Sequence, residues 1–373
     1  MLELGRAGTP MDAVAGIVPS VVAEPADEQE TASILRNASQ AGLSVIPTAG
    51  GTKLDWGNPP RKADVLLSMR RLNRVIEHAW ADLTVTVEAG CTIAELQRTL
   101  AEHGQRLAVD PLWPERATIG GILATNDSGA LRLAFGALRD LIIGVTLVLA
   151  DGTIAKSGGK VVKNVAGYDL PKLATGSMGT LGVITRAVFR LHPLPRNTRT
   201  LTITAVDADD MQRVILAILG AKLAATAVQA RSKNQVDILL EGTEDGIAAQ
   251  EATIRNMGTV REGSPEVWQA REQLWSDAPI VKFTTLPSRI AAASMLFSRL
   301  VIQATGIGYA PFTGDLHGLR EAMEQNGGSL VILGKTELDA WGSSGDALPL
   351  MRAVKAQFDP NNTLNPGRYV GGI

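Results

Sequence analysis

Two glycine-rich stretches decide the fold of this chain: PTAGGTKLDWG at residues 47–57 and TIGGILATNDSG at residues 118–129. Each combines small residues with glycines, which allow the backbone angles and the close approach that wrapping around an anion requires. A single glycine is explained equally well by a tight turn. Two such stretches in one domain indicate a ligand with a diphosphate and a long body, which is a dinucleotide.

The composition is that of a folded protein with a sizeable core. The chain has 373 residues, of which 45% are hydrophobic and 20% charged, and this length favours two domains. The net charge of −2 and the pI of about 6.1 give no reason to expect nucleic acid as a partner. Basic residues cluster at 61–74, but Asp64 and Glu77 accompany them, which favours a solvated face.

The single cysteine, Cys91, excludes an intramolecular disulfide and any cysteine-based iron–sulfur or zinc site within the chain. Residues 1–20 lack the apolar core of a secretory signal. The longest strongly apolar run, 141–150, is far shorter than the roughly 20 residues that span a bilayer. We therefore expect a cytoplasmic protein without a transmembrane segment.

The first half of the chain predicts alternating strands and helices. Asp27 is the expected N-cap of an amphipathic helix over 28–41. Thr92 and Glu95 have the spacing of a capping box and open a second helix that ends at His103. Asp151-Gly152 predicts a two-residue hairpin turn. The expected strands are 43–47, 64–68, 83–89 (half-buried by its alternation), 141–150, 153–155 and 182–191.

The proline-rich segment 192–196 predicts a domain boundary. The pattern beyond it indicates an antiparallel sheet with helices on one face. A polar, turn-rich tail that starts at Phe358 is expected to pack back on the rest of the chain. The strands predicted in this half are 201–206, 235–241, 280–285, 307–311 and 329–333, and the helices are 209–219, 246–257, 265–276 and 288–303.

The Rossmann fingerprint G-x-G-x-x-G is absent, which disfavours an ordinary nicotinamide dehydrogenase. The ordered set of motifs instead resembles the FAD-binding family named for vanillyl-alcohol oxidase and para-cresol methylhydroxylase (PCMH). The motifs are Ala26–Glu28, Gly50–Thr52, Asp110-Pro111, Thr118–Gly121, Asn126 with Gly129, Phe135–Asp140, Lys163–Leu170 and Gly176–Thr185. The resemblance implies an α+β fold: a two-lobed PCMH-type FAD-binding domain (1–195), an α+β cap domain of antiparallel sheet plus helices (196–345), and a C-terminal tail (346–373) that returns to the FAD domain.

The resemblance also assigns roles to single residues. It implies that the backbone of Gly50, Gly51 and Thr52 holds the FAD diphosphate, opposite Thr118, Gly120 and Gly121. It places Asn126, Ser128 and Gly129 along the flavin and ribityl chain, and Gly182, Val183 and Ile184 at the adenine or ribose end. The second stretch is expected to open a helix turn whose N–H groups favour an anion.

Non-covalent FAD is expected. Some members of the family bind FAD covalently through a histidine in or near these loops. The four histidines here are His78, His103, His192 and His317, and none falls in either glycine-rich stretch.

Lys163–Leu170 and the tail motif Asn365–Arg368 resemble the branch of the family that oxidises 2-hydroxy acids. That branch usually combines a stretch of the type H-x-G-D-G-N-x-H with a later E-H-G, which bind a metal and the substrate. The corresponding region here, 308–318, reads GYAPFTGDLHG, and its His317 is alone. No catalytic residue and no metal site is therefore predicted, and we interpret His317 as a structural or surface histidine.

A flavin site without substrate machinery resembles the E-subunit family of bacterial glycolate oxidases (glycolate dehydrogenases). The resemblance implies an FAD-dependent oxidoreductase on CH–OH donors that supports the oxidation of glycolate to glyoxylate as one subunit of a complex. The implied partners are a catalytic flavoprotein subunit and an iron–sulfur subunit. The implied location is cytoplasmic, with any association to a membrane made through these partners.

Two alternatives remain open from the residues. The chain could be an autonomous FAD-linked 2-hydroxy acid (D-lactate-like) dehydrogenase whose substrate is held by Arg289, Arg320 and Arg368. It could also be a scaffold subunit with a vestigial flavin site. Arg368 either reaches an anionic group or fixes the tail, and Tyr168 has either a packing or a chemical role.

Overall fold

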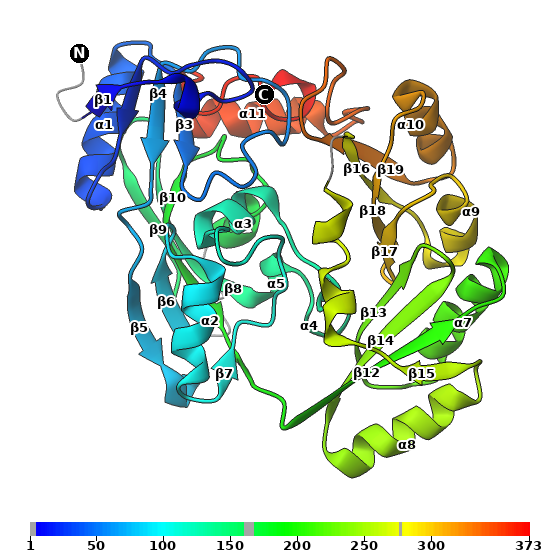
Figure 1. Cartoon of the computed structure of the whole chain (residues 1–373). Helices are drawn as coiled ribbons and strands as arrows, with labels where there is room; N and C mark the ends of the chain where they lie inside the picture. The colour runs from blue at the N-terminus through cyan, green and yellow to red at the C-terminus, as the bar shows by residue number, and fades with distance from the viewer. Residues whose placement is uncertain (1–4, 160–167, 276–277) are drawn as a thin grey trace. The chain divides into compact units, whose positions relative to one another are not determined.

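A computed structural model describes residues 5–159, 168–275 and 278–373, which form two compact units (Figure 1). The first unit contains Met1–Asp127, Ala137–Pro193 and Asp339–Ile373, and the second contains Ser128–Gly136 and Leu194–Leu338. Most of the motif Lys163–Leu170 lies outside the described residues.

The first sheet of the first unit is four-stranded, in the order β1-β2-β4-β3, and β2, β4 and β3 run parallel. Helix α1 (Glu28–Gln40) begins where predicted, because the Asp27 carboxylate accepts the Glu30 N–H. Its buried Ile34, Leu35 and Ala38 pack against the sheet. The strands are β1 (Gly5–Ala7), β2 (Val21–Ala23), β3 (Val45–Thr48) and β4 (Val65–Ser68).

The second sheet of this unit is antiparallel and five-stranded, in the order β5-β6-β10-β8-β9. The predicted hairpin between β8 and β9 is present, closed by the Leu149 N–H donating to the Thr153 carbonyl. Helix α2 (Ile93–Ala101) begins at Thr92, whose hydroxyl accepts the Glu95 N–H. The strands are β5 (Val75–Ala79), β6 (Thr84–Glu88), β8 (Ile142–Val148), β9 (Ile154–Gly158) and β10 (Val183–Arg190).

The prediction of a half-buried strand at 83–89 was wrong. All five residues of β6 are buried, the polar ones included, and Val85 and Val87 belong to the hydrophobic core of this part of the chain. The carboxylate of Glu88, for example, accepts the backbone N–H and the guanidinium of Arg74. Alternation in the sequence does not distinguish a strand with one solvated face from an interior strand whose polar face is satisfied.

The second unit is built on an eight-stranded sheet in the order β15-β12-β14-β13-β17-β18-β16-β19. Neighbouring strands in this sheet run antiparallel to each other. Helices α7 (Ala208–Gly220), α8 (Glu244–Arg255), α9 (Ile290–Ser294) and α10 (Leu316–Gln325) contribute to one hydrophobic core with it. The predicted α+β fold with an antiparallel sheet is thus confirmed. The strands are β12 (Asn197–Thr204), β13 (Ala225–Arg231), β14 (Gln235–Gly242), β15 (Val260–Glu262), β16 (Ile280–Thr284), β17 (Val301–Gln303), β18 (Ile307–Pro311) and β19 (Ser329–Leu333).

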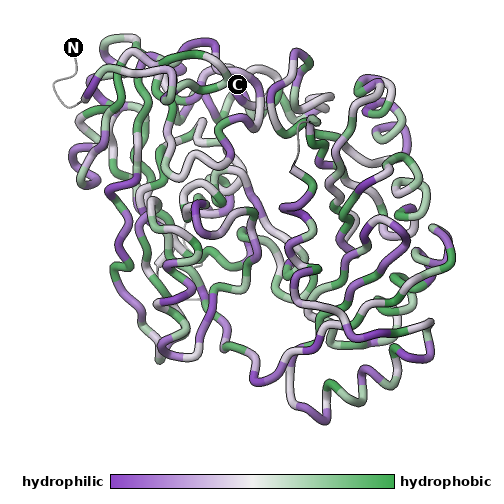
Figure 2. Tube along the Cα trace, viewed as in Figure 1, coloured by the Kyte–Doolittle hydropathy of each residue, from purple (hydrophilic) through white to green (hydrophobic). Residues whose placement is uncertain are grey.

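Two helices predicted in this half were wrong. The segment 288–303 holds only the short α9 before the chain pairs as β17 with β13 and β18. The segment 265–276 forms two short 3₁₀ turns, Pro265–Gln269 and Glu272–Leu274. Figure 2 shows hydrophilic and hydrophobic residues alternating along α8, where the predicted helix at 246–257 is present. In 301–303, pairing with β13 and β18 makes the segment a strand.

Residues 128–136, which the sequence assigned to the first domain, lie in the second unit. The reason is α4 (Arg132–Phe135), whose Leu133 packs against the core of that unit. The C-terminal segment, with α11 (Leu348–Phe358), lies in the first unit. Among the described residues, no helix is long and apolar enough to cross a membrane.

Candidate cofactor site

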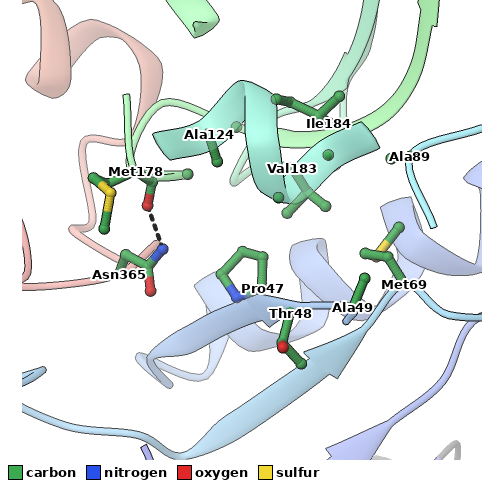
Figure 3. A pocket seen from close by; sticks show the side chains of 14 residues that line it. Pro47, Thr48, Ala49, Met69, Ala89, Ala124, Met178, Val183, Ile184 and Asn365 are labelled. Carbon is green, nitrogen blue, oxygen red and sulfur yellow. Dashed lines mark hydrogen bonds between the residues drawn. The ribbon is translucent and has the colours of Figure 1, made fainter. Parts of the chain in front are cut away.

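A cleft in the first unit is lined by both glycine-rich stretches. It consists of two adjoining cavities, which share residues 47–49, Gly121, Ala124, Met178 and Asn365. Figure 3 shows Pro47 of β3 facing Val183 across one of these cavities, while the side chain of the next residue, Thr48, points the other way. The cleft is therefore formed where β3, α3 (Ile119–Thr125) and the start of β10 meet.

The loop after β3 offers unused hydrogen-bond donors. Within the described residues, the backbone N–H groups of Gly50, Gly51 and Thr52 donate no hydrogen bond. Gly51 has a φ of 70°, in the left-handed region. A Cβ on Gly50 would lie 1.9 Å from the carbonyl oxygen of Arg116, so only glycine fits there. Successive free N–H groups in a turn form a concave site for an anion.

The second stretch opens a helix turn, as expected, but its N–H groups are already used. Ile119 donates to the Cys91 carbonyl at 3.0 Å and Gly120 donates to the Ala89 carbonyl at 2.7 Å. The Thr118 hydroxyl caps the Gly121 N–H at 3.4 Å. The expectation that this helix start holds an anion is therefore not met, because acceptors within the fold already bind its N–H groups. Its glycines serve close approach instead.

Most residues predicted to bind the cofactor come together in this cleft, and three do not. Asn126 ends α3 with a φ of 48° and does not line the cleft. Its Oδ1 is buried and has no hydrogen-bond partner among the described residues. Ser128 and Gly129 belong to the second unit. The predicted residues that line the cleft are Gly50, Gly51, Thr52, Thr118, Gly120, Gly121, Gly182, Val183 and Ile184.

Sequence reasoning missed several residues that line the cleft. Asn365 is 4% exposed, and its Nδ2 donates to the Met178 carbonyl at 2.5 Å (Figure 3). The motifs Gly176–Thr185 and Asn365–Arg368 were recognised, so these positions carried a signal that was not used. Small and apolar lining residues carry no such signal. The missed residues are Pro47, Thr48, Ala49, Lys53, Leu54, Met69, Ala89, Ala124, Thr125, Met178, Gly179 and Asn365.

Arg368 fixes the tail to the loop that follows the first glycine-rich stretch. Its guanidinium donates to the carbonyls of Leu54, Trp56 and Asn58. Arg368 is only 3% exposed, and this burial lowers the pKa of its guanidinium to about 10. Of the two roles open from the sequence, the observed one is structural.

Neither a histidine nor the cysteine is among the described residues that line the cleft. The His317 side chain is 74% exposed on α10, with Nδ1 3.5 Å from the Glu321 carboxylate, so it is a surface histidine. Burial raises the pKa of the Cys91 thiol to about 11, which makes it unreactive. The described residues contain no group of three or more His, Cys, Asp or Glu able to hold a metal.

Tyr168 and two candidate arginines do not line the cleft. Tyr168 is 91% exposed among the described residues. Arg289 donates to the side chain and carbonyl of Asn326. Arg289 and Arg320 both belong to the second unit.

The residues of the cleft fit FAD. The free N–H groups of Gly50–Thr52 suit a diphosphate. Gly121 leaves room for close approach, since a Cβ there would meet only the Thr118 hydroxyl, at 3.3 Å, whereas a Cβ on Gly120 would lie 2.9 Å from the Cβ of Ala89. Met69, Ala89, Val183 and Ile184 give the first cavity an apolar wall suited to a ring system.

Comparison with protein families identifies two parts of the chain. Residues 19–158 match the FAD binding domain, and residues 340–369 match the C-terminal domain of FAD linked oxidases. The resemblance to an FAD-binding family and the assignment of FAD as the cofactor are therefore confirmed. The C-terminal match contains Asn365 and Arg368, which line the cleft beside the first match.

Several characterised proteins are similar to this chain. Glycolate oxidase subunit GlcD of Bacillus subtilis is 34% identical over 55% of this chain and 44% of its own length. A D-lactate dehydrogenase of Archaeoglobus fulgidus is 34% identical over 58% of this chain and 48% of its own length. The mitochondrial D-lactate dehydrogenase (cytochrome) of Arabidopsis thaliana is 27% identical over 95% of this chain and 74% of its own length. The chain thus spans about half the length of the first two relatives.

Solved structures of alkyldihydroxyacetonephosphate synthase share the fold. In two crystal forms they are 19% and 18% identical to this chain, with TM-scores of 0.70 and 0.71 over 94% of it and 78% and 77% of the synthase chains. At this level of identity the likeness concerns the fold alone.

Proposed function

We propose that this chain, which carries an FAD binding domain, is the FAD-binding subunit of a multi-subunit oxidase that converts glycolate, or a close 2-hydroxy acid, to the 2-oxo acid. The observation that carries the proposal is the loop Gly50–Thr52, whose free N–H groups line a cleft built from both glycine-rich stretches. A glycolate oxidase subunit and two D-lactate dehydrogenases among its relatives supply the substrate class.

The residues of the cleft would hold FAD by its diphosphate and by one of its ring systems. The N–H groups of Gly50, Gly51 and Thr52 donate to the diphosphate, and the absence of a side chain on Gly121 lets it approach the backbone. The apolar wall of Met69, Val183 and Ile184 binds a ring and excludes water from it. FAD, when bound, supplies the acceptor for the two electrons removed from a CH–OH group.

The positions of the candidate substrate residues favour a partner-dependent reaction. His317 faces solvent, the Arg368 guanidinium binds backbone carbonyls, and Arg289 binds Asn326. We infer that a catalytic flavoprotein subunit supplies the substrate site and that an iron–sulfur subunit accepts the electrons. A cytoplasmic hetero-oligomer is part of this proposal.

One observation favours a second candidate, an autonomous FAD-linked dehydrogenase of the D-lactate type. The Arabidopsis D-lactate dehydrogenase aligns with 95% of this chain, which includes the second unit. In that case the substrate would be held within this chain, and no partner would be needed for reduction of the flavin.

An absorption spectrum of the protein purified alone, before and after anaerobic glycolate or D-lactate, distinguishes these functions. We expect a flavin spectrum that neither substrate bleaches until the catalytic subunit is added. Bleaching of the chain alone would favour the autonomous dehydrogenase. A protein that shows no flavin spectrum after FAD is added would contradict both and leave a scaffold.

A further inference from the structure

A buried ion pair joins the two glycine-rich stretches. Lys53 directly follows the loop Gly50–Thr52, and Asp127 lies just beyond the end of α3. Nζ of Lys53 lies 3.3 Å from Oδ2 of Asp127, and their side chains are 4% and 0% exposed. All of these residues belong to the first unit.

The surroundings of the pair hold both charges in place. Nζ of Lys53 lies 5.5 Å from the ring centre of Trp56 and 5.6 Å from that of Trp113, distances at which an indole face attracts a cation. Oδ2 of Asp127 also accepts the backbone N–H of Leu112 at 2.9 Å. The pair therefore fixes the first stretch, the segment at 112–113 and the end of α3 to one another.

Stability alone does not explain such a pair. The cost of removing two charges from water offsets their attraction, and apolar residues of the same volume often hold a fold equally well. An ammonium and a carboxylate, however, must meet at one distance, so a buried pair specifies geometry where apolar packing tolerates shifts. Lys53 lines the same cavity as Gly50–Thr52 and Gly121, so the geometry that it specifies is that of the cleft.

We propose that Lys53 and Asp127 form a positioning pair for the cofactor. The pair holds the loop Gly50–Thr52 at a fixed distance from α3, so that the free N–H groups of the loop meet the diphosphate without rearrangement. Donors that are already in place bind more tightly, because the loop loses no further conformational entropy when the ligand binds. This inference rests on the proposed FAD site and adds to it two residues that act through the loop backbone.

The test compares variants by FAD affinity, by the visible circular dichroism of the bound flavin and by the melting temperature of the apoprotein. Lys53→Met should weaken FAD binding about tenfold or more and change the circular dichroism of the flavin. Lys53→Arg, which keeps the charge and the donors, should recover part of the affinity. The double variant Lys53→Met/Asp127→Asn leaves no lone buried charge, so it should remain folded and still bind FAD weakly.

A matched control breaks a buried pair elsewhere. Arg231 and Asp237 of the second unit form an ion pair with side chains 21% and 0% exposed. Arg231→Met should lower the melting temperature and leave FAD affinity and the flavin spectrum unchanged. Wild-type affinity and an unchanged spectrum in the double variant would overturn the positioning role while the cofactor site stands. A wild-type protein that binds no FAD would overturn the cofactor site and this inference together.

Discussion

The glycines of the first unit differ in what a side chain at each position would meet. A Cβ on Gly50 would lie 1.9 Å from the Arg116 carbonyl oxygen, so this glycine is required by the fold itself. A Cβ on Gly121 would meet only the Thr118 hydroxyl, at 3.3 Å, and Gly121 lines both cavities of the cleft. Gly121 is therefore the position where a cofactor role can be tested without disturbing the fold.

We expect Gly121→Ala to weaken FAD binding about tenfold or more while the melting temperature of the apoprotein stays the same or rises. The added methyl group occupies space that the cofactor needs, whereas alanine suits a helix better than glycine. Titration of the apoprotein with FAD, followed by flavin fluorescence, measures the affinity.

Gly220→Ala provides the control for this substitution. Gly220 ends α7, and a Cβ there would meet nothing within 4 Å. It should leave FAD affinity unchanged. Equal affinities in the wild type and Gly121→Ala would show that the cofactor does not approach Gly121.

Among the elements, α11 and the turn after it act as a clamp on the cleft. Nζ of Lys355 donates to the carbonyls of Thr180 and Leu364, at 2.8 and 2.9 Å, and pairs with the Asp359 carboxylate. Asp359 in turn accepts the N–H groups of Thr363 and Leu364. Burial lowers the pKa of Lys355, an effect that Asp359 opposes. The clamp thus ties the tail to Thr180, beside the Met178 and Gly179 that line the cleft.

We expect Asp359→Ala to lower the free energy of unfolding by about 3–5 kcal/mol, because it leaves Lys355 charged, buried and without its counter-ion. FAD affinity should also fall, since Asn365 follows the clamp and lines the cleft. Urea unfolding and FAD titration measure the two effects.

A surface pair serves as the comparison for the clamp. Glu244 pairs with Arg199, and its side chain is 62% exposed. Glu244→Ala should cost no more than about 1 kcal/mol. A loss of similar size in both variants would mean that the Lys355–Asp359 pair has no special role.

At the scale of the whole molecule, the first unit is assembled from distant parts of the chain. Leu364 packs in the same core as Val45 and Val65. The Val45 N–H donates to the Thr363 carbonyl at 2.7 Å, and the Asn365 N–H donates to the Val45 carbonyl at 3.0 Å. The last residues therefore extend the sheet edge at β3, from which the cofactor loop emerges.

We expect a chain that ends at Leu338 to lose FAD binding, because it lacks Asn365, Arg368 and the contacts to β3. The flavin content of the purified truncated protein, relative to the full chain, measures this. Its circular dichroism in the far ultraviolet should still report the strands of the second unit. A truncated chain with full flavin content would mean that the tail is not part of the cofactor site.

The sequence by itself determined those features that depend on neighbouring residues. Asp27 and Thr92 start α1 and α2 because a capping side chain bonds to an N–H three residues away. In the first stretch, Gly50 and Gly51 stand where only glycine permits the contact or adopts the backbone angle. The family resemblance and FAD followed from the order of these motifs, which the family matches confirm.

The tertiary structure alone decided what depends on contacts between distant residues. It made 301–303 a strand because two partner strands lie on either side of it. It placed residues 128–136 in the second unit through α4. It brought Asn365 to the cleft and paired Lys53 with Asp127. Burial and long-range hydrogen bonds set these outcomes; the tail motif at 365–368 predicted a return to the first domain but not the contacts that Asn365 makes there.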